Sequence, residues 1–81
     1  MRVTVRLFAR LTDIVGRAEV ARDLPTGSTV SALWRQLASE YPPLAGYERS
    51  MSMAVNADYA RMDAVLEEGD EVAFLPPVSG G

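Results

Sequence analysis

The sequence predicts an α+β fold in which a mixed sheet of four to five strands supports one long helix across one face. Three observations lead to this prediction. Near the start of the chain, apolar residues alternate with polar ones. A long apolar stripe at helical spacing follows in the middle, and a short apolar run lies near the end. A length of 81 residues suits one domain with one core, and a hydrophobic content of 48% argues against disorder.

The first part of the chain predicts two strands separated by a short helix. Residues 2–8 alternate between apolar and mostly polar side chains, as in a half-buried strand. Residues 9–15 have apolar side chains at helical spacing over one or two turns, and Gly16 follows as a helix stop. Residues 19–24 alternate more weakly and form a second strand, which ends at the turn residues 25–27.

The main helix begins after a hydroxyl cap and ends before a proline. Ser28 or Thr29 can accept hydrogen bonds from the free amides of the first turn. The apolar stripe consists of Val30, Leu33, Trp34, Leu37 and Tyr41. Because Pro42 disfavours helical geometry at the residue before it, the helix is expected to end at Tyr41. Trp34 lies on the stripe and is therefore expected in the core.

After the helix, we expect a loop over residues 43–50, in which a short turn can form around Leu44. It leads into a third strand at residues 51–56, where side chains alternate again. Residues 56–58 read as a turn, because Asn and Asp tolerate left-handed geometry and bond their own backbone. Residues 59–65 are expected to be irregular or a short strand. Residues 66–70 form a tight acidic turn.

The last apolar run, residues 72–75, has the pattern of a strand buried on both faces. Pro76 and Pro77 cannot donate to a sheet ladder, so strand pairing should end there and the chain should leave in an extended direction. With this strand beside the first one, the order of elements fits a β-grasp fold. We therefore predict a domain at residues 1–75 and a flexible tail at residues 76–81.

The tail ends on Gly80-Gly81. Residues without side chains let a backbone and its terminal carboxylate enter a channel too narrow for a Cβ atom. The terminal carboxylate then becomes a reactive group at the end of a narrow backbone segment. The plainer interpretation, a frayed terminus, is common at chain ends.

Composition excludes several function classes. The chain has no cysteine and no histidine, which removes thiolate zinc sites, cysteine nucleophiles and the usual general base. We find no phosphate-binding loop and no nucleophile–base pair, so the chain is not expected to have an active site of its own.

A net charge of −3 argues against nucleic acid and anionic membranes as partners. No stretch is apolar enough to span a bilayer, and the chain opens directly into a strand pattern, so we expect a cytoplasmic protein. All eight basic residues are arginine, so no side chain of this molecule could accept another copy through a lysine linkage.

Residues 69–81, which end in Phe-Leu-Pro-Pro-Val-Ser-Gly-Gly, resemble the C-terminal signature of the small subunits of molybdopterin synthase, which are ubiquitin-like sulfur carriers. The resemblance also includes residues 54–56, residues 8–9 in the first strand and Gly16, so it covers nearly the whole chain. It implies the same β-grasp (ubiquitin-like) fold.

The resemblance implies that Gly81 is adenylated by an ATP-using, E1-like activating enzyme and then converted to a thiocarboxylate. The large subunit of a heterotetrameric synthase would use this group to place dithiolene sulfurs on a pterin precursor. ATP and the pterin would be bound by these partners, and this chain would bind no cofactor or metal. Three alternatives remain open: a carrier for thiazole, cysteine or tRNA thiolation, a protein modifier, and a plain interaction module.

Two groups of residues would serve such a carrier. The tail residues expected to enter the partner's active site with Gly81 are Pro77, Val78, Ser79 and Gly80. The candidates for the apolar partner interface are Phe8, Tyr59, Phe74 and Leu75. Because neighbouring strand residues point to opposite faces, we expect Phe74 in the core and Leu75 nearer the interface. The acidic residues at 67–71 are either a solvated loop or a charged docking patch.

Overall fold

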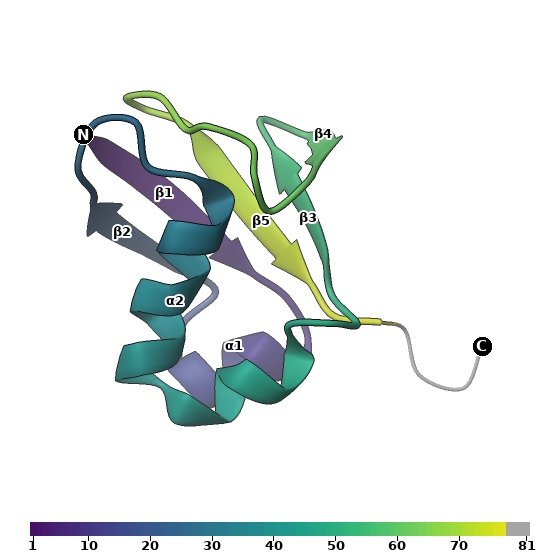
Figure 1. Ribbon diagram of the computed structural model, residues 1–81. Helices are drawn as coiled ribbons and strands as arrows, with labels where there is room; N and C mark the ends of the chain where they lie inside the picture. The colour runs from purple at the N-terminus through teal and green to yellow at the C-terminus, as the bar shows by residue number, and fades with distance from the viewer. Residues whose placement is uncertain (78–81) are drawn as a thin grey trace.

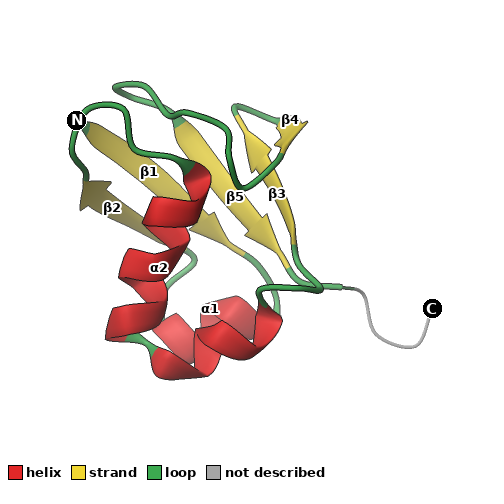
Figure 2. Cartoon of the chain, in the orientation of Figure 1, coloured by secondary structure: helices red, strands yellow, loops and turns green. Residues whose placement is uncertain are grey.

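A computed structural model of the protein, described over residues 1–77, has the predicted β-grasp fold: a five-stranded mixed sheet crossed on one face by α2 (Figure 1). The elements in chain order are β1 (Arg2–Leu7), α1 (Arg10–Val15), β2 (Glu19–Asp23), α2 (Val30–Glu40), the 3₁₀ helix η1 (Pro42–Tyr47), β3 (Ser52–Val55), β4 (Asp58–Ala60) and β5 (Glu71–Leu75) (Figure 2). Within residues 1–77, no helix combines the length and the apolar character needed to cross a membrane.

The first and last strands lie side by side in the middle of the sheet, as predicted. The strand order is β2-β1-β5-β3-β4. β1 and β5 run parallel with Val5 opposite Val72 and Leu7 opposite Phe74, while the other three pairings are antiparallel. A parallel pair needs a long crossover connection, and the chain between β1 and β5, which includes α2, provides it.

Helix α2 closes the core over one face of this sheet. Thr29 is the N-cap, and its hydroxyl oxygen accepts a hydrogen bond from the Ala32 amide at 3.2 Å, which satisfies one of the free donors of the first turn. Four members of the predicted stripe are buried, and Tyr41 is the half-buried C-cap. The rings of Trp34 and Phe74 pack at a centroid distance of 5.0 Å. The predicted core position of Trp34 is confirmed.

Two predicted turns depend on left-handed backbone geometry. Gly16 ends α1 at φ 86° and donates its amide hydrogen bond to the Thr12 carbonyl at 2.7 Å. Asn56 and Ala57 both have positive φ, at 50° and 72°, as required in a tight two-residue hairpin between β3 and β4. The Asn56 side chain also accepts a hydrogen bond from the Glu71 amide at 3.0 Å, so this turn is tied to the start of β5.

One prediction about local structure is wrong, and another is extended. The short turn expected around Leu44 after α2 is present as the longer 3₁₀ helix η1, which packs Leu44 into the core. β5 is not buried on both faces, since Val72 and Phe74 are buried while Ala73 and Leu75 are only half-buried. The apolar character of all four residues suggested two covered faces, but α2 covers one. The short strand considered within residues 59–65 is present as β4, which begins at Asp58.

Candidate functional site

A hollow of ≈330 Å³ lies on the open face, the side of the sheet that faces away from α2. Its lining residues come from β1, β3, β4, β5 and the segments beside them. They are Arg6, Phe8, Ala54, Ala57, Tyr59, Glu71, Ala73 and Leu75. The structure therefore brings three of the four predicted interface residues to one place, although they are far apart in the sequence.

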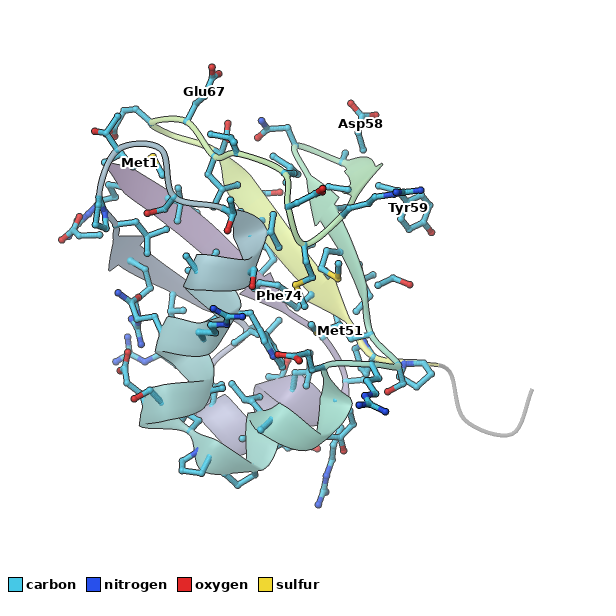
Figure 3. The ribbon with its side chains drawn as sticks, in the orientation of Figure 1. Met1, Met51, Asp58, Tyr59, Glu67 and Phe74 are labelled. Atoms are coloured by element: carbon cyan, nitrogen blue, oxygen red, sulfur yellow. The ribbon has the colours of Figure 1, made fainter. Side chains whose placement is uncertain are left out.

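Phe8, Tyr59 and Leu75 form the larger apolar walls of this hollow. Tyr59 is 86% exposed and Phe8 is 39% exposed, so both rings present apolar surface to solvent at the hollow. Figure 3 shows the Tyr59 ring pointing outward from β4. The Arg6 guanidinium carbon lies 5.8 Å from the centre of the Phe8 ring, a cation–π distance that holds this ring at the hollow.

Phe74 was also a candidate for the partner interface, and that prediction is wrong. Its side chain is 0% exposed and lies between the sheet and α2 (Figure 3). The expectation that Phe74 is core and Leu75 lies nearer the surface is confirmed. The reason is the period of the strand: Phe74 shares a face with Val72, and Leu75 shares the other face with Ala73.

The floor of the hollow consists of small side chains that sequence reasoning did not single out. Ala54 in β3 lies directly opposite Ala73 in β5. Ala73 could have been assigned to this face from the sequence, because it lies two residues before Leu75. Ala54 could not, because its pairing with Ala73 depends on the register between β3 and β5.

Charged side chains occupy one rim of the hollow. The Arg6 guanidinium lies 3.7 Å from the Glu71 carboxylate and 3.9 Å from the Glu19 carboxylate, and all three side chains are partly exposed. Exposed pairs of this kind contribute little to stability, typically less than about 1 kcal/mol. One arginine and two glutamates leave this rim with an excess of negative charge.

The acidic turn before β5 mainly organises the chain itself. The Asp70 carboxylate accepts hydrogen bonds from the Glu67 amide at 2.8 Å and from the Asn56 side chain at 2.9 Å. Glu68 accepts a hydrogen bond from the Arg2 amide at 3.0 Å. These bonds connect the turn to β1 and to the β3–β4 hairpin. A docking role for the exposed acidic side chains stays a prediction.

At the other end of the open face, Arg2 and Asp23 form an exposed ion pair. Arg2 and Asp23 lie opposite each other on β1 and β2, with a guanidinium–carboxylate distance of 3.1 Å. The hydrogen bond and the positive charge of Arg2 hold the pKa of Asp23 below its ordinary value. In the described part of the chain, no three His, Cys, Asp or Glu side chains are grouped as metal ligands would be.

The hollow lies next to the point where the chain leaves the sheet. Leu75 is both a lining residue and the last residue of β5, and Pro76 follows it directly. The predicted end of strand pairing at the prolines is confirmed. The tail residues singled out from the sequence, Val78, Ser79, Gly80 and Gly81, lie outside the described residues.

Comparisons with known proteins give one consistent family. The model of the ThiS family matches residues 5–81. A molybdopterin synthase sulfur carrier subunit from Escherichia coli is 40% identical over 83 residues, covering 98% of this chain and 99% of that protein.

Solved structures show the same fold. SAMP1 (small archaeal modifier protein 1) from Haloferax volcanii superposes with a TM-score of 0.87 at 27% identity, covering 100% of both chains. A putative molybdopterin converting factor subunit 1 from Pyrococcus furiosus gives 0.86 at 29% identity, covering 96% of this chain and 99% of that one. A complex of subunits 1 and 2 of molybdopterin-converting factor from Helicobacter pylori contains a chain with the same fold, with a TM-score of 0.69, 24% identity and 100% coverage of both chains.

The family match spans nearly the whole chain, and the relative from Escherichia coli is matched over almost its full length. The fold, the paired prolines after β5 and the Gly-Gly end agree with that match. The chain belongs to the ThiS family of ubiquitin-like proteins, among the molybdopterin synthase sulfur carrier subunits.

Proposed function

We propose that the chain carries sulfur for molybdopterin synthesis as a thiocarboxylate on Gly81, and that the open-face hollow docks the proteins that load and use it. The observation that supports this most directly is the position of the hollow. It adjoins Leu75, the last residue before the paired prolines, so a protein that binds there also lies where the tail begins.

The chemistry requires only one group from this chain. A carboxylate is a poor acyl donor because its oxygen is a poor leaving group. Reaction with ATP forms an acyl-adenylate at Gly81 and releases pyrophosphate, and a sulfur nucleophile then displaces AMP. The product is a thiocarboxylate, a good sulfur nucleophile at neutral pH. ATP and the pterin precursor would be bound by the partners.

The two proposed partners are an E1-like activating enzyme and the large catalytic subunit of the synthase. The complex of subunits 1 and 2 known from Helicobacter pylori supports the second partner by analogy of fold. Gly80 and Gly81 have no side chain, which suits passage through a narrow channel into either active site. Pro77, Val78 and Ser79 would form the part of the tail that precedes them.

Intact-mass spectrometry tests the proposal. The chain is incubated with the activating enzyme, ATP and a sulfur donor, and the expected mass gain corresponds to the replacement of one oxygen by sulfur. Deletion of Gly81 and the substitution Gly80→Val should both abolish the gain without changing the melting temperature, whereas Ser79→Ala should retain it. A mass that stays unchanged with an activating enzyme known to be competent would contradict the proposal.

A second candidate function is protein modification, which the structural likeness to SAMP1 favours. In that case Gly81 would form amide bonds with lysines of other proteins. Since all eight basic residues of this chain are arginine, such conjugates would contain single copies rather than lysine-linked chains. Covalent adducts on many unrelated proteins in an ATP-supplemented lysate would support this function, and their absence beside a clear thiocarboxylate would support the carrier alone.

A further inference from the structure

We infer that Arg6 protects the activated Gly81 carboxyl from attack by its own chain. Position 6 needs a positive charge and lies close to the start of the tail. A guanidinium supplies this charge without the nucleophilic amine that a lysine would bring. This inference rests on the proposed function, because only an activated carboxyl is open to such attack. It gives Arg6 a role in the specificity of acyl transfer, in addition to its ion pairs.

The surroundings of Arg6 require a positive charge but not an arginine in particular. Its guanidinium lies 3.7 Å from the Glu71 carboxylate and 3.9 Å from the Glu19 carboxylate. Its central carbon lies 5.8 Å from the centre of the Phe8 ring. A lysine ammonium can form ion pairs and cation–π contacts as well. Both carboxylate distances are longer than in the bidentate pairs for which the forked guanidinium is preferred. Electrostatics alone therefore does not select arginine here.

Chemical reactivity does distinguish the two side chains. A lysine amine that has lost its proton is a nucleophile toward activated acyl groups, and the ordinary lysine pKa of about 10.4 leaves a small neutral fraction at neutral pH. A guanidinium stays protonated in proteins and has no lone pair to offer. In an attack by an amine, a C–N bond would form at the Gly81 carbonyl carbon and the C–O bond to AMP would break. AMP would leave with the electron pair, the amine would release a proton, and the cyclic chain could no longer accept sulfur.

The tail can reach position 6. Arg6 lies opposite Ala73 on the parallel strands β1 and β5, so it is two residues along the sheet and one strand across from Leu75. At about 3.3 Å per residue and about 4.8 Å between strands, the two Cα atoms are about 8 Å apart. The six residues after Leu75 span up to about 20 Å when fully extended. An amine at position 6 would therefore meet the Gly81 carboxyl at a high effective concentration.

The other end of β1 lies at the limit of this reach. Arg2 also lies on the open face and pairs with a carboxylate across the strands, that of Asp23, at 3.1 Å. The register between β1 and β5 places Arg2 six residues along the sheet from the level of Leu75, a distance of about 20 Å. The tail would have to turn back along the sheet and be fully extended to arrive there. Arg2 is therefore a matched control for Arg6.

The described structure also keeps the α-amino group of Met1 away from the tail. This group lies at the Arg2 end of the sheet, where it donates a hydrogen bond to the Leu24 carbonyl at 2.7 Å. Figure 1 shows the N-terminus and the end of β5 at opposite ends of the sheet. Because all eight basic residues are arginine, no lysine elsewhere in the chain is available to the tail. Position 6 is thus the place where a change from arginine to lysine should matter most.

The test compares the same substitution at the two ends of β1. Arg6→Lys places an amine near the tail and Arg2→Lys places one far from it, and both keep the charge. Each variant and the wild type are prepared as full chains with a C-terminal mercaptoethanesulfonate thioester, in which a thiolate takes the place of AMP as the leaving group. Intact-mass spectrometry follows the reaction at mildly alkaline pH, because a cyclic product is lighter than the free chain by one water.

We expect Arg6→Lys to cyclise at least about tenfold faster than Arg2→Lys, because the effective concentration falls with distance. The wild type should be hydrolysed without forming a cyclic product. Tandem mass spectrometry should locate the new amide between the side chain at position 6 and Gly81. Equal rates in the two variants would overturn the inference, as would a wild type that cyclises as fast as Arg6→Lys. A rate that rises with protein concentration would show attack between chains and would also overturn it.

Thermal melts check that the variants are folded. Arg6 is partly exposed, so Arg6→Lys should keep the melting temperature of the wild type. If it does not fold, Thr4→Lys gives the same test, because Thr4 lies on the open face of β1 between the two arginines and opposite Glu71. Its rate should also exceed that of Arg2→Lys. A folded variant with the amine at position 6 or 4 that forms no cyclic product would overturn the inference.

The outcome is distinguishable from that of the proposed function. The thioester experiment needs no activating enzyme, whereas thiocarboxylate formation on wild-type Gly81 is measured with that enzyme, ATP and a sulfur donor. A wild type that forms the thiocarboxylate, together with an Arg6→Lys thioester that does not cyclise, would reject the inference alone. Cyclisation of Arg6→Lys without any wild-type thiocarboxylate would reject the proposed function and leave the measured reactivity at position 6 unchanged.

Discussion

The two faces of β5 show how one short strand can serve both stability and recognition. Phe74 and Leu75 are adjacent and similarly apolar, yet Phe74 is sealed beneath α2 while Leu75 lines a hollow on the open face. The difference comes from the two-residue period of a strand, which sends neighbouring side chains to opposite sides of the sheet. Residues on the two faces can therefore change independently, although they share one backbone.

The covered face is built for packing. Trp34 from α2 meets Phe74, and the residues of β1 and β5 that point toward the helix are buried apolar side chains. The open face has small alanines in the middle, larger apolar side chains around them and an ion pair at the rim. The comparison predicts that substitutions on the covered face change folding stability, whereas those on the open face change partner binding.

The largest expected effect belongs to the covered face. Phe74→Ala should lower the free energy of unfolding by about 3–5 kcal/mol, because it removes a buried ring and leaves a cavity beside Trp34. Urea denaturation followed by circular dichroism measures this loss. Since small domains have only about 5–15 kcal/mol of stability in total, the variant should be close to unfolding at 37 °C. A loss below about 1 kcal/mol would contradict the assignment of Phe74 to the core.

At Leu75, the neighbouring position, we expect a substitution to change partner binding more than stability. Leu75→Ala should weaken binding to the large synthase subunit by roughly 30-fold, equivalent to about 2 kcal/mol, because it removes one wall of the hollow. Its stability should change less than that of Phe74→Ala, since Leu75 is only half-buried. Calorimetric titration measures the affinity and a thermal melt measures the stability. If both variants lost stability equally and bound equally well, the division between the faces would be wrong.

A smaller effect is expected at the start of the helix that covers the sheet. Thr29→Ala removes the hydroxyl oxygen that accepts from the Ala32 amide, and should cost about 1 kcal/mol of stability. The change lies on the covered side, so affinity for the partner should stay unchanged once the folded fraction is taken into account. Thr29→Ser, which keeps the hydroxyl, is the matched control and should restore most of the stability.

The smallest expected effect concerns the far end of the open face. Arg2 lowers the pKa of Asp23, so this pair contributes stability above the unfolded pKa of about 4 and loses that contribution as the pH falls through the lower folded value. Arg2→Gln should raise the pKa of Asp23 toward its ordinary value, as measured by NMR titration of the carboxyl carbon. Partner binding at neutral pH should not change, because neither residue lines the hollow. A clear loss of affinity would extend the interface to this end.

Much of the fold could be predicted because local signals were strong. The alternation around Val5, the stripe that includes Trp34 and the capping hydroxyl of Thr29 each act over a few residues, and the structure contains them where the sequence indicated. The turns at Gly16 and Asn56 could be predicted for the same reason, because positive φ favours these residue types at single positions. The 3₁₀ helix after α2 was predicted only as a short turn around Leu44, because its full length depends on burying Leu44 against the rest of the core rather than on a local pattern.

The candidate site was predictable only in part. Phe8, Tyr59 and Leu75 were chosen as exposed apolar residues, and they do line one hollow. Phe74 was misplaced in that group, and Ala54 and Ala73 were not considered. A large apolar side chain near a strand end attracts notice in a sequence, whereas an alanine becomes informative only when its neighbours across the sheet are known.

The sequence by itself determined most of the segments that form strands and helices, and the chemical nature of the Gly-Gly end, because these depend on side-chain period, capping and backbone freedom within a few residues. Only the tertiary structure decided which face of the sheet α2 covers, and which side chains meet on the other. That decision depends on strand order and register, which join residues as distant as Phe8, Ala54 and Leu75 around one hollow.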